Sequence, residues 1–195
     1  MKPITYPARP TNGGGKPGSL PGNFIYETKD NGWRALVHIG TGTMFNRKGE
    51  LLSIADEFKP ALELMRGTLD AECFKWADCE ALERRHGIGR GCLVVLDVVP
   101  EPAHADASYA ERRRWLDAVL RPHDLAPFTP DGVPRLCLAP QVYPSDWERL
   151  QAINRQLGCE FYEGMVAKRA DSPYNIQLVS PDQTTSAWVK YRWDW

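Results

Sequence analysis

The chain has 195 residues and a mass of 22.0 kDa, which is enough for one full hydrophobic core but hardly for two independent domains. Its 24 lysines and arginines face 25 aspartates and glutamates, so no global positive field marks it as a nucleic-acid binder, and any site for a polyanion has to be local. The sequence contains no apolar run of the ~18–20 residues that cross a bilayer, no signal-peptide core, and five cysteines without a C-x-x-C pair, so we expect reduced thiols, no membrane partner and a cytoplasmic location.

The first 22 residues differ in amino-acid composition from the rest of the chain. They are rich in proline and glycine and show no hydrophobic periodicity, which indicates an extended arm or a flexible leader. The stretch GGGKPGS within them lacks the G-x-x-x-x-G-K-[ST] spacing of a phosphate-binding loop, so we interpret it as linker. We expect residues 23–195 to form a single folded domain.

The first half of this expected domain consists of short apolar segments separated by turns. An Asp-Asn-Gly turn at 30–32 joins two alternating segments and predicts a hairpin within an antiparallel meander. Apolar residues at helical spacing follow, where Pro60 would delay or kink a helix. The expected elements are strands at 23–29, 33–39 and 42–47, a helix at 54–66, a strand at 68–76, a short helix at 78–86 and a buried strand at 92–99.

The second half contains two amphipathic helices with the sequence signature of a capping box. Ser108 is followed three positions later by Glu111, Ser145 is followed by Glu148 in the same way, and Gly158 would end the second helix. The expected elements are helices at 108–120 and 145–157 and strands at 135–143, 164–170 and 186–195. Strands interrupted by single helices, without regular β-α-β alternation, predict an α+β domain built on antiparallel sheets flanked by helices.

Charged residues recur inside the apolar strand segments. Burying one unpaired charge costs several kcal/mol, so a repeated pattern indicates that the strands share a polar cleft. Its carboxylates could hold a divalent cation and its basic groups could hold phosphates. Each charge also has a purely structural interpretation, as an exposed hairpin residue, a turn cap or an edge-strand cation. The residues concerned are Lys29, Glu72, Asp97, Glu163, Lys168, Lys190 and Arg192.

Six short motifs in one order resemble those of the covalent nucleotidyltransferases, the superfamily of ATP-dependent DNA ligases, RNA ligases and mRNA capping enzymes. KDNG at 29–32 resembles the K-x-(D/N)-G signature, and FNRKGE resembles the arginine-glycine motif that follows it. LDAEC, VVLDVV, EGMVAK and WVKYR are similar to the later motifs of the family, in the family's order. The resemblance implies the nucleotidyltransferase fold of DNA ligases, an ATP-grasp-like α+β core, over Glu27 to Arg192.

The resemblance also implies a role for each motif residue. Lys29 would be the nucleophile whose neutral amine attacks the α-phosphate of ATP, giving lysyl-AMP and pyrophosphate. Cations nearby, such as Lys190 or Mg²⁺, would lower the pKa of Lys29 toward neutrality. The other implied contacts are Glu27 and Thr28 beside the adenine, Leu96 over the base, Glu72 on the ribose hydroxyl, Arg34 and Arg47 on ribose, phosphates or the nicked strand, Lys168 and Lys190 on the α-phosphate, Arg192 on nucleic acid, and Glu163 with Asp97 on Mg²⁺.

The sequence departs from the family pattern in three places. Leu96 stands where many relatives place an aromatic residue that stacks on adenine, and Ala71 replaces the glycine beside Glu72. The chain also stops at Trp195, where relatives continue into an oligonucleotide-binding barrel, so we expect no such domain here. Adenylation and sealing would then be slower, or an accessory protein would supply the missing clamp. The short leader leaves no room for the extra domain of NAD-dependent ligases, which favours ATP.

The resulting hypothesis is a single-domain, ATP-dependent DNA ligase that seals nicked duplex DNA with Mg²⁺ as a charge-neutralising template. Three alternatives stay open: an RNA ligase of the same superfamily, a non-catalytic module that binds nucleic-acid ends, and an α+β domain with incidental motif matches. At near-zero net charge the grip on a duplex has to be local, and Lys2, Arg9 and Lys16 of the leader are candidates for it.

Overall fold

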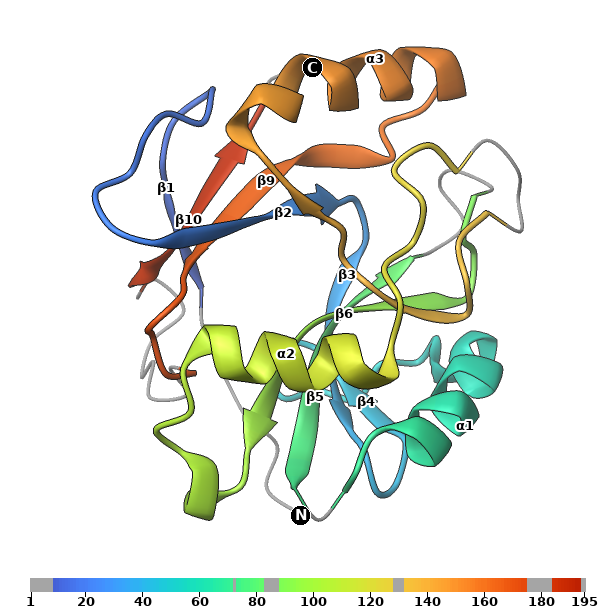
Figure 1. The fold of residues 1–195 in the computed structure, drawn as a ribbon. Coiled ribbons are helices and arrows are strands. Elements are labelled where there is room, and N and C mark those ends of the chain that lie inside the picture. The colour runs from blue at the N-terminus through green and yellow to red at the C-terminus, as the bar shows by residue number, and fades with distance from the viewer. Residues whose placement is uncertain (1–8, 72, 83–87, 128–131, 175–183, 194–195) are drawn as a thin grey trace.

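The computed structural model describes residues 9–71, 73–82, 88–127, 132–174 and 184–193, and two five-stranded sheets dominate it. The first sheet has the strand order β1-β10-β9-β2-β8, and the second has the order β4-β3-β5-β6-β7 (Figure 1). The pairings are antiparallel except for β1 with β10 and β6 with β7. The predicted α+β class is therefore confirmed.

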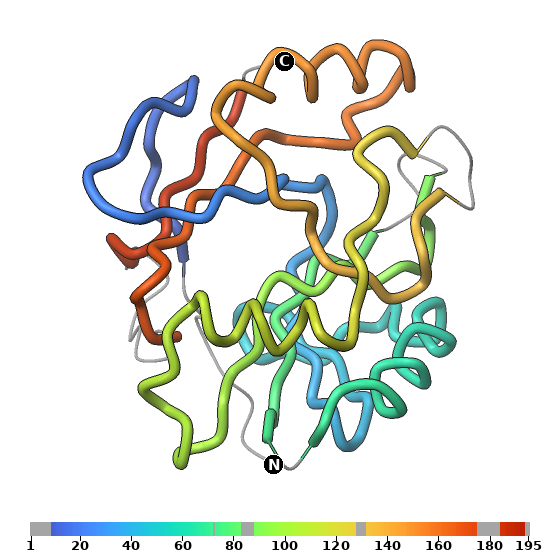
Figure 2. The backbone as a smooth tube through the Cα atoms, in the orientation of Figure 1, coloured from blue at the N-terminus to red at the C-terminus, as the bar shows by residue number. Residues whose placement is uncertain are grey.

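The first sheet combines strands from both ends of the chain. Its members are β1 (Pro10–Asn12), β10 (Thr185–Arg192), β9 (Tyr162–Arg169), β2 (Phe24–Asp30) and β8 (Gln141–Val142). Helix α3 (Trp147–Leu157) covers one face, where its apolar residues join Met165, Ala167 and Tyr191 in one hydrophobic cluster. In Figure 2 the blue leader runs beside the red C-terminal strand, so the expected leader takes part in this sheet.

The second sheet is built mainly from the first half of the chain. Its members are β4 (Thr43–Phe45), β3 (Trp33–His38), β5 (Phe74–Leu82), β6 (Cys92–Pro100) and β7 (Leu136–Leu138). Helix α1 (Lys59–Thr68) packs on one face together with Leu116 of helix α2 (Tyr109–Val119). Short 3₁₀ turns occupy Ala55–Phe58, Pro102–His104 and Pro144–Asp146.

Several predicted element boundaries are confirmed. The predicted turn at 31–32 is present, but the predicted hairpin is wrong, because β2 lies in the first sheet and β3 in the second. Pro60 lies in the first turn of α1, where its missing N–H has no helical partner to lose. The reciprocal capping of α2 by Ser108 and Glu111 is present. Gly158 ends α3 in the left-handed conformation, with φ of 66°. The predicted capping by Ser145 is wrong, because this residue lies in the 3₁₀ turn before α3.

The predicted strand at 68–76 and helix at 78–86 are wrong. Helix α1 continues to Thr68, and the strand begins at Phe74 and runs through Leu82, while residues 83–86 lie outside the described chain. Residues 76–82 are all buried because β5 sits between β3 and β6 with both faces covered. A strand covered on both faces does not alternate between polar and apolar residues, so its sequence resembles a short helix.

The predicted strand at 135–143 divides into two. Leu136–Leu138 join the second sheet as β7, and Gln141–Val142 join the first sheet as β8. The chain crosses from one sheet to the other at Ala139 and Pro140, and Pro140 accepts a hydrogen bond from the backbone of Thr28 at 3.1 Å. The crossing ties the two sheets together beside the strand that carries Lys29.

Candidate active site

One face of the first sheet is polar, opposite the face that α3 covers. The register pairs Lys29 with Gly164 and Gly164 with Arg192, so these positions point to the same side. Because side chains alternate along a strand, the same face carries every second residue in both directions. Its charged members are Glu27 and Lys29 on β2, Lys168 on β9, and Lys190 and Arg192 on β10. Residues separated by more than a hundred positions are thereby brought together.

Lys29 lies at the centre of a short chain of ion pairs. Its Nζ atom contacts the carboxylate of Glu163, and the same carboxylate oxygen lies 2.7 Å from Nη2 of Arg192. The side chains of Lys29 and Glu163 are only 20% and 14% exposed. Charges that are shielded from water interact more strongly than surface charges, so this arrangement fixes the position of the lysine amine.

Gly164 sets the geometry next to Glu163. Its φ is +150°, and a Cβ atom built there would lie 1.9 Å from the backbone oxygen of Tyr191. The pairing of β2 with β9 also shifts in register between Lys29 and Asp30. This close approach of β9 and β10 has room for glycine alone, and it lets the Glu163 side chain reach the lysine.

Lys190 shares the neighbourhood of Lys29. Burial lowers the pKa of Lys190, and the positive charges of Arg192, Arg9 and Lys29 lower it further. Several cations therefore meet on one part of the polar face. An anionic group such as a phosphate would relieve their mutual repulsion.

The second sheet contributes Arg34, Asp78 and Glu80 to the same region. Arg34 forms a bidentate pair with Asp78, with Nε to Oδ1 at 2.8 Å and Nη2 to Oδ2 at 2.5 Å. The hydroxyl of Tyr174 donates to the same carboxylate at 2.7 Å. Arg34 is thus held in place by a fully buried carboxylate, and its side chain remains 21% exposed.

Glu80 was not predicted as a site residue. Burial raises its pKa to about 7; the charges of Lys29 and Arg34 act against this shift, whereas those of Glu163 and Asp30 add to it. The carboxyl group is therefore close to the Lys29 pair and can exchange a proton near neutral pH. The signal for it was present as Asp78-Cys79-Glu80, an Asp-x-Glu pattern like the Asp-Ala-Glu assigned at 70–72.

Glu72, predicted to bind the ribose hydroxyl, lies outside the described residues. The described residues around it form a turn between α1 and β5, with Asp70 exposed. Its role therefore stays a prediction. Asp78 and Glu80 form another Asp-x-Glu pair, on β5, the central strand of the second sheet.

A second buried cluster surrounds Glu27. Nζ of Lys168 lies 2.7 Å from its carboxylate, and Arg113 and Tyr109 of α2 contact the other oxygen. Lys168 also donates to the backbone oxygen of Leu96 at 2.5 Å. It pairs with Ile25 in the sheet, four residues and about 13 Å along β2 from Lys29 at the usual strand rise. The structure thus joins Lys168 to Glu27 and not to the Lys29 pair.

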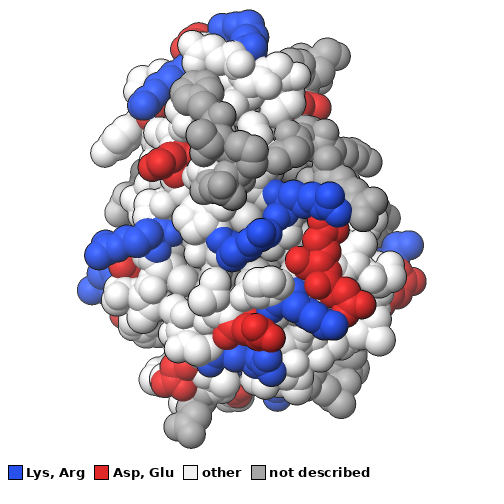
Figure 3. Space-filling view, turned by 90° about the vertical axis from the view of Figure 1, so that its right-hand side faces the viewer, with Lys and Arg blue, Asp and Glu red and all other residues white. Residues whose placement is uncertain are grey.

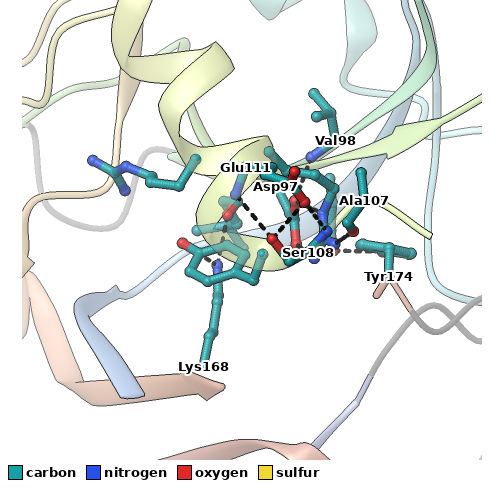
Figure 4. A network of polar contacts seen from close by, with 12 residues as sticks. Asp97, Val98, Ala107, Ser108, Glu111, Lys168 and Tyr174 are labelled. Carbon is teal, nitrogen blue, oxygen red and sulfur yellow. Dashed lines mark hydrogen bonds and ion pairs between the residues drawn. The ribbon is translucent and has the colours of Figure 1, made fainter. Parts of the chain in front are cut away.

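Asp97 lies in a buried pair with Arg112. Nε and Nη2 of Arg112 lie 2.8 and 2.9 Å from its two oxygens, and both side chains are fully buried. Asp97 accepts a further hydrogen bond from the backbone of Val98, and Arg112 donates to the backbone oxygens of Ala107 and Ser172 (Figure 4). Asp97 therefore anchors α2 to β6, and its oxygens are already occupied.

A divalent cation fits Glu163 and Glu80 better than Glu163 and Asp97. Mg²⁺ is commonly held by one or two carboxylates together with substrate phosphates. Glu80 is a carboxylate whose ionised form burial disfavours, so a cation beside it would stabilise that form. Among the described residues, no three His, Cys, Asp or Glu side chains converge to hold a metal by themselves.

The remaining predicted site residues lie around this cleft. Leu96 is half-buried and packs at the edge of the cluster under α3. Thr28 pairs with Met165, on the α3 side of the sheet, so its side chain points away from Lys29. Arg47 is exposed in the turn after β4. The structure brings Lys29, Glu163, Lys190 and Arg192 together, and it leaves Arg47 and the side chain of Thr28 outside that group.

The sequence also did not reveal a buried contact between His123 and Asp30, the residue after Lys29. The neighbouring carboxylate of Asp30 is buried and lies 2.9 Å from Nε2 of His123, while Nδ1 of that ring lies 2.9 Å from the backbone oxygen of Asp124. Both partners are acceptors when Asp30 is ionised, so the doubly protonated ring satisfies both contacts. No sequence motif links residues so far apart in the chain.

The fold is that of DNA ligase catalytic domains. The ligase domain of M. tuberculosis LigD matches with a TM-score of 0.63 and 20% identity over 96% of this chain and 59% of that one. A mycobacterial DNA ligase D complexed with ATP and MES gives 0.61 and 21%, over 96% and 60%. Chlorella virus DNA ligase-adenylate gives 0.53 and 11%, over 95% and 69%.

The chain therefore spans about 60% of the length of the first two structures. No protein-family model and no curated protein matches the sequence. None of the described helices has the length and apolar character that a membrane span requires. The predicted nucleotidyltransferase fold is confirmed by the structural matches.

Proposed function

We propose that the chain is the nucleotidyltransferase core of an ATP-dependent DNA ligase, with Lys29 as the nucleophile. The observation that carries this proposal is the partly buried pair of Lys29 and Glu163 on a polar sheet face, beside Lys190, Arg192 and Glu80. A structural lysine on an exposed edge would have no reason for these surroundings. The match to a ligase complexed with ATP supports ATP as the nucleotide.

In the first step the Nζ atom of Lys29 forms a bond to the α-phosphorus of ATP, and the bond from that phosphorus to the bridging oxygen of the β-phosphate breaks. Pyrophosphate leaves with the bonding electrons. The attacking amine has to be neutral. Glu163, in contact with Lys29, and Glu80, with a pKa of about 7, are the two groups placed to take its proton.

Basic side chains stabilise the charge that develops on the phosphate. Lys190 and Arg192 lie on the same sheet face as Lys29, and Arg34 is held opposite by Asp78. Fixed positive groups stabilise a transition state without reorganising during the reaction. Mg²⁺, when bound, would add charge neutralisation, and Glu163 and Glu80 are the carboxylates that would hold it together with phosphate oxygens.

The later steps use the same site. Lysyl-AMP would transfer AMP to the 5′-phosphate of a nick, and the adjacent 3′-hydroxyl would then displace AMP and close the phosphodiester bond. The Glu27 cluster, fixed by Lys168 and Arg113, is the part of the cleft that we assign to the base. We assign the strand's phosphates to Arg192 and Arg34.

Covalent labelling tests the proposal. Incubation with ATP labelled at the α-phosphate and Mg²⁺ should leave a label on the protein that survives denaturation. Lys29→Ala should abolish the label, whereas the matched control Lys59→Ala, which removes an exposed lysine paired with Asp56, should retain it. Folded protein that takes no label, or a label that persists in Lys29→Ala, would contradict the proposal.

Substrate choice needs a separate comparison. Sealing of a nicked DNA duplex, an RNA nick and single-stranded RNA, each with a 5′-phosphate, separates a DNA ligase from an RNA ligase. We expect the DNA nick to be sealed fastest, since the matched structures are DNA ligases by name. Faster sealing of RNA would favour the RNA ligase, and binding of nicked DNA without any labelling would favour an end-binding module.

A further inference from the structure

A pocket of ≈ 620 Å³ opens where the leader meets the end of β10. It borders the polar sheet face, because Arg192 contacts Glu163 and Glu163 contacts Lys29. The residues that line it come from the leader, from the segment before β9 and from β10. They include Asn12, Gly15, Glu160, Lys190, Arg192 and Trp193.

The leader forms a fixed wall of this pocket. Strand β1 pairs with β10, and the backbone N–H of Gly13 donates to the oxygen of Lys190 at 2.9 Å. A Cβ atom on Gly13 would lie 2.5 Å from Val189 and 2.6 Å from Tyr191, so only glycine lets the leader approach this closely. Lys16 forms an ion pair with Glu148 of α3 and holds the leader further along. The glycine run is therefore part of a built surface.

Two basic side chains and one carboxylate belong to the described lining of the pocket. Lys190 and Arg192 line it, and the charge of Arg9 also acts on Lys190. Glu160 is the acidic residue of the described lining, and Arg192 forms an ion pair with Glu163. Cations held close together on a rigid strand favour an anionic ligand, and phosphate oxygens suit both ammonium and guanidinium groups.

We propose that this pocket binds phosphate groups of the substrate, so that the leader is one wall of the phosphate site. The inference rests on the proposed function and extends it to residues outside the motifs. Two sources share the chemistry: the β- and γ-phosphates of ATP, and the phosphodiester backbone of the nicked strand. The position of the pocket beside Arg192 and Glu163 allows either to continue from the group that Lys29 attacks.

Gly15 offers a clean test of the wall. A Cβ atom there has no neighbour within 4 Å, and its backbone is not in the left-handed region, so a side chain can be added without strain. Gly15→Glu places a negative charge at the pocket. Gly15→Ala controls for the loss of glycine. Gly18→Glu places the same charge in the leader at a position that is equally open and does not line the pocket.

Three measurements separate the sources: the rate of lysyl-AMP formation against ATP concentration, binding of a 5′-phosphorylated nicked duplex against salt, and direct binding of inorganic pyrophosphate. If the pocket holds the β- and γ-phosphates of ATP, Gly15→Glu should weaken both ATP use in lysyl-AMP formation and pyrophosphate binding by about tenfold, because like charges placed together are strongly unfavourable. If the pocket holds the nicked strand, the variant should weaken nick binding by about tenfold. Gly18→Glu should stay within about twofold of the unmodified protein, and Gly15→Ala should lose less than Gly15→Glu. A loss of ATP use and pyrophosphate binding assigns the pocket to ATP, and a loss of nick binding assigns it to the nicked strand.

Equal behaviour of Gly15→Glu and Gly18→Glu in all three measurements would overturn the proposal. Failure of the proposed function looks different. If the unmodified protein forms no lysyl-AMP, the two binding measurements still compare Gly15→Glu with its controls, so the pocket is tested whether or not Lys29 reacts.

Discussion

The raised pKa of Glu80 makes the stability of the protein depend on pH. Its pKa rises from an ordinary value of 4.5 to about 7, first through burial. The folded protein then binds more protons than the unfolded chain between these values, so Glu80 lowers the stability as the pH rises across that window. The loss is on the order of 3 kcal/mol.

Glu80→Gln should therefore remove part of the pH dependence. Gln cannot ionise, and the variant should lose less stability than the unmodified protein between pH 5 and pH 8. Urea unfolding at both pH values measures this difference. The same pH slope in both proteins would show that Glu80 is not buried next to Glu163.

His123 predicts a second dependence with its own window. Burial lowers its pKa, but the charge of Asp30 and the hydrogen bond to it outweigh burial, so the pKa is raised above 6.5. The pair stabilises the protein fully below 6.5, and that contribution disappears as the pH rises through the raised value. His123→Gln leaves the buried Asp30 without its cation and should cost roughly 3 kcal/mol at pH 6. Thermal unfolding at pH 6 and at pH 9 should show a smaller cost at the higher pH; an equal cost would contradict the ion pair.

Asp97 separates a structural from a metal-binding role. Both of its oxygens accept from Arg112 in a fully buried position, and removing one partner of such a pair costs roughly 3–5 kcal/mol. Asp97→Asn should therefore lower the free energy of unfolding by about 3 kcal/mol and leave the Mg²⁺ concentration for half-maximal labelling unchanged. Glu163→Gln should raise that concentration. A Mg²⁺ shift in Asp97→Asn, at a temperature where it is folded, would restore the predicted metal role.

At the scale of elements, the close approach of β9 and β10 depends on Gly164. Gly164→Ala places a methyl group against the backbone of Tyr191 in a strained conformation, and should cost roughly 2 kcal/mol or more. Gly158→Ala is the control, because its φ is also positive but its Cβ would meet nothing within 4 Å. Denaturant unfolding compares the two, and equal costs would show that strand contact is not the cause.

Local signals in the sequence were sufficient for some elements and insufficient for others. The turn at 31–32 and the cap of α2 could be predicted, because each depends on residues a few positions apart. The assignment of β2 and β3 to different sheets could not, because it depends on strands remote in sequence. Strand β5 could not, because both of its faces are buried. The division of 135–143 between two sheets depends on contacts with β2 and β6, which are remote in sequence.

The site follows the same rule. Lys29, Glu163, Lys190 and Arg192 were identified through the resemblance of their motifs to a family, and the structure brings their side chains together. The pairing of Asp97 with Arg112 depends on where α2 packs against β6, and that of Lys168 with Glu27 depends on the register of β9 with β2. Glu80 was not identified from the sequence, where the Asp-x-Glu pattern at 70–72 resembles the family motif. Side-chain partners across elements are set by packing, and no local pattern encodes them.

At the scale of the whole molecule, positive and negative charges are balanced, so any binding site for nucleic acid has to be a local group of cations. The net charge is −1, and on the face in Figure 3 acidic and basic residues are interspersed without one broad positive surface. Strong binding of a duplex would require many phosphate contacts. Lys29, Lys190 and Arg192 nevertheless lie together on one face of the first sheet. This distribution fits a catalytic core that recognises a reactive end.

The central claim is that Lys29 forms a bond to AMP. The most direct measurement is peptide mass mapping of the protein after incubation with ATP and Mg²⁺, followed by addition of pyrophosphate. We predict that the peptide containing Lys29 gains the mass of one AMP and loses it again when pyrophosphate reverses the reaction. AMP found on another residue, or an unmodified Lys29 in folded protein, would contradict the account.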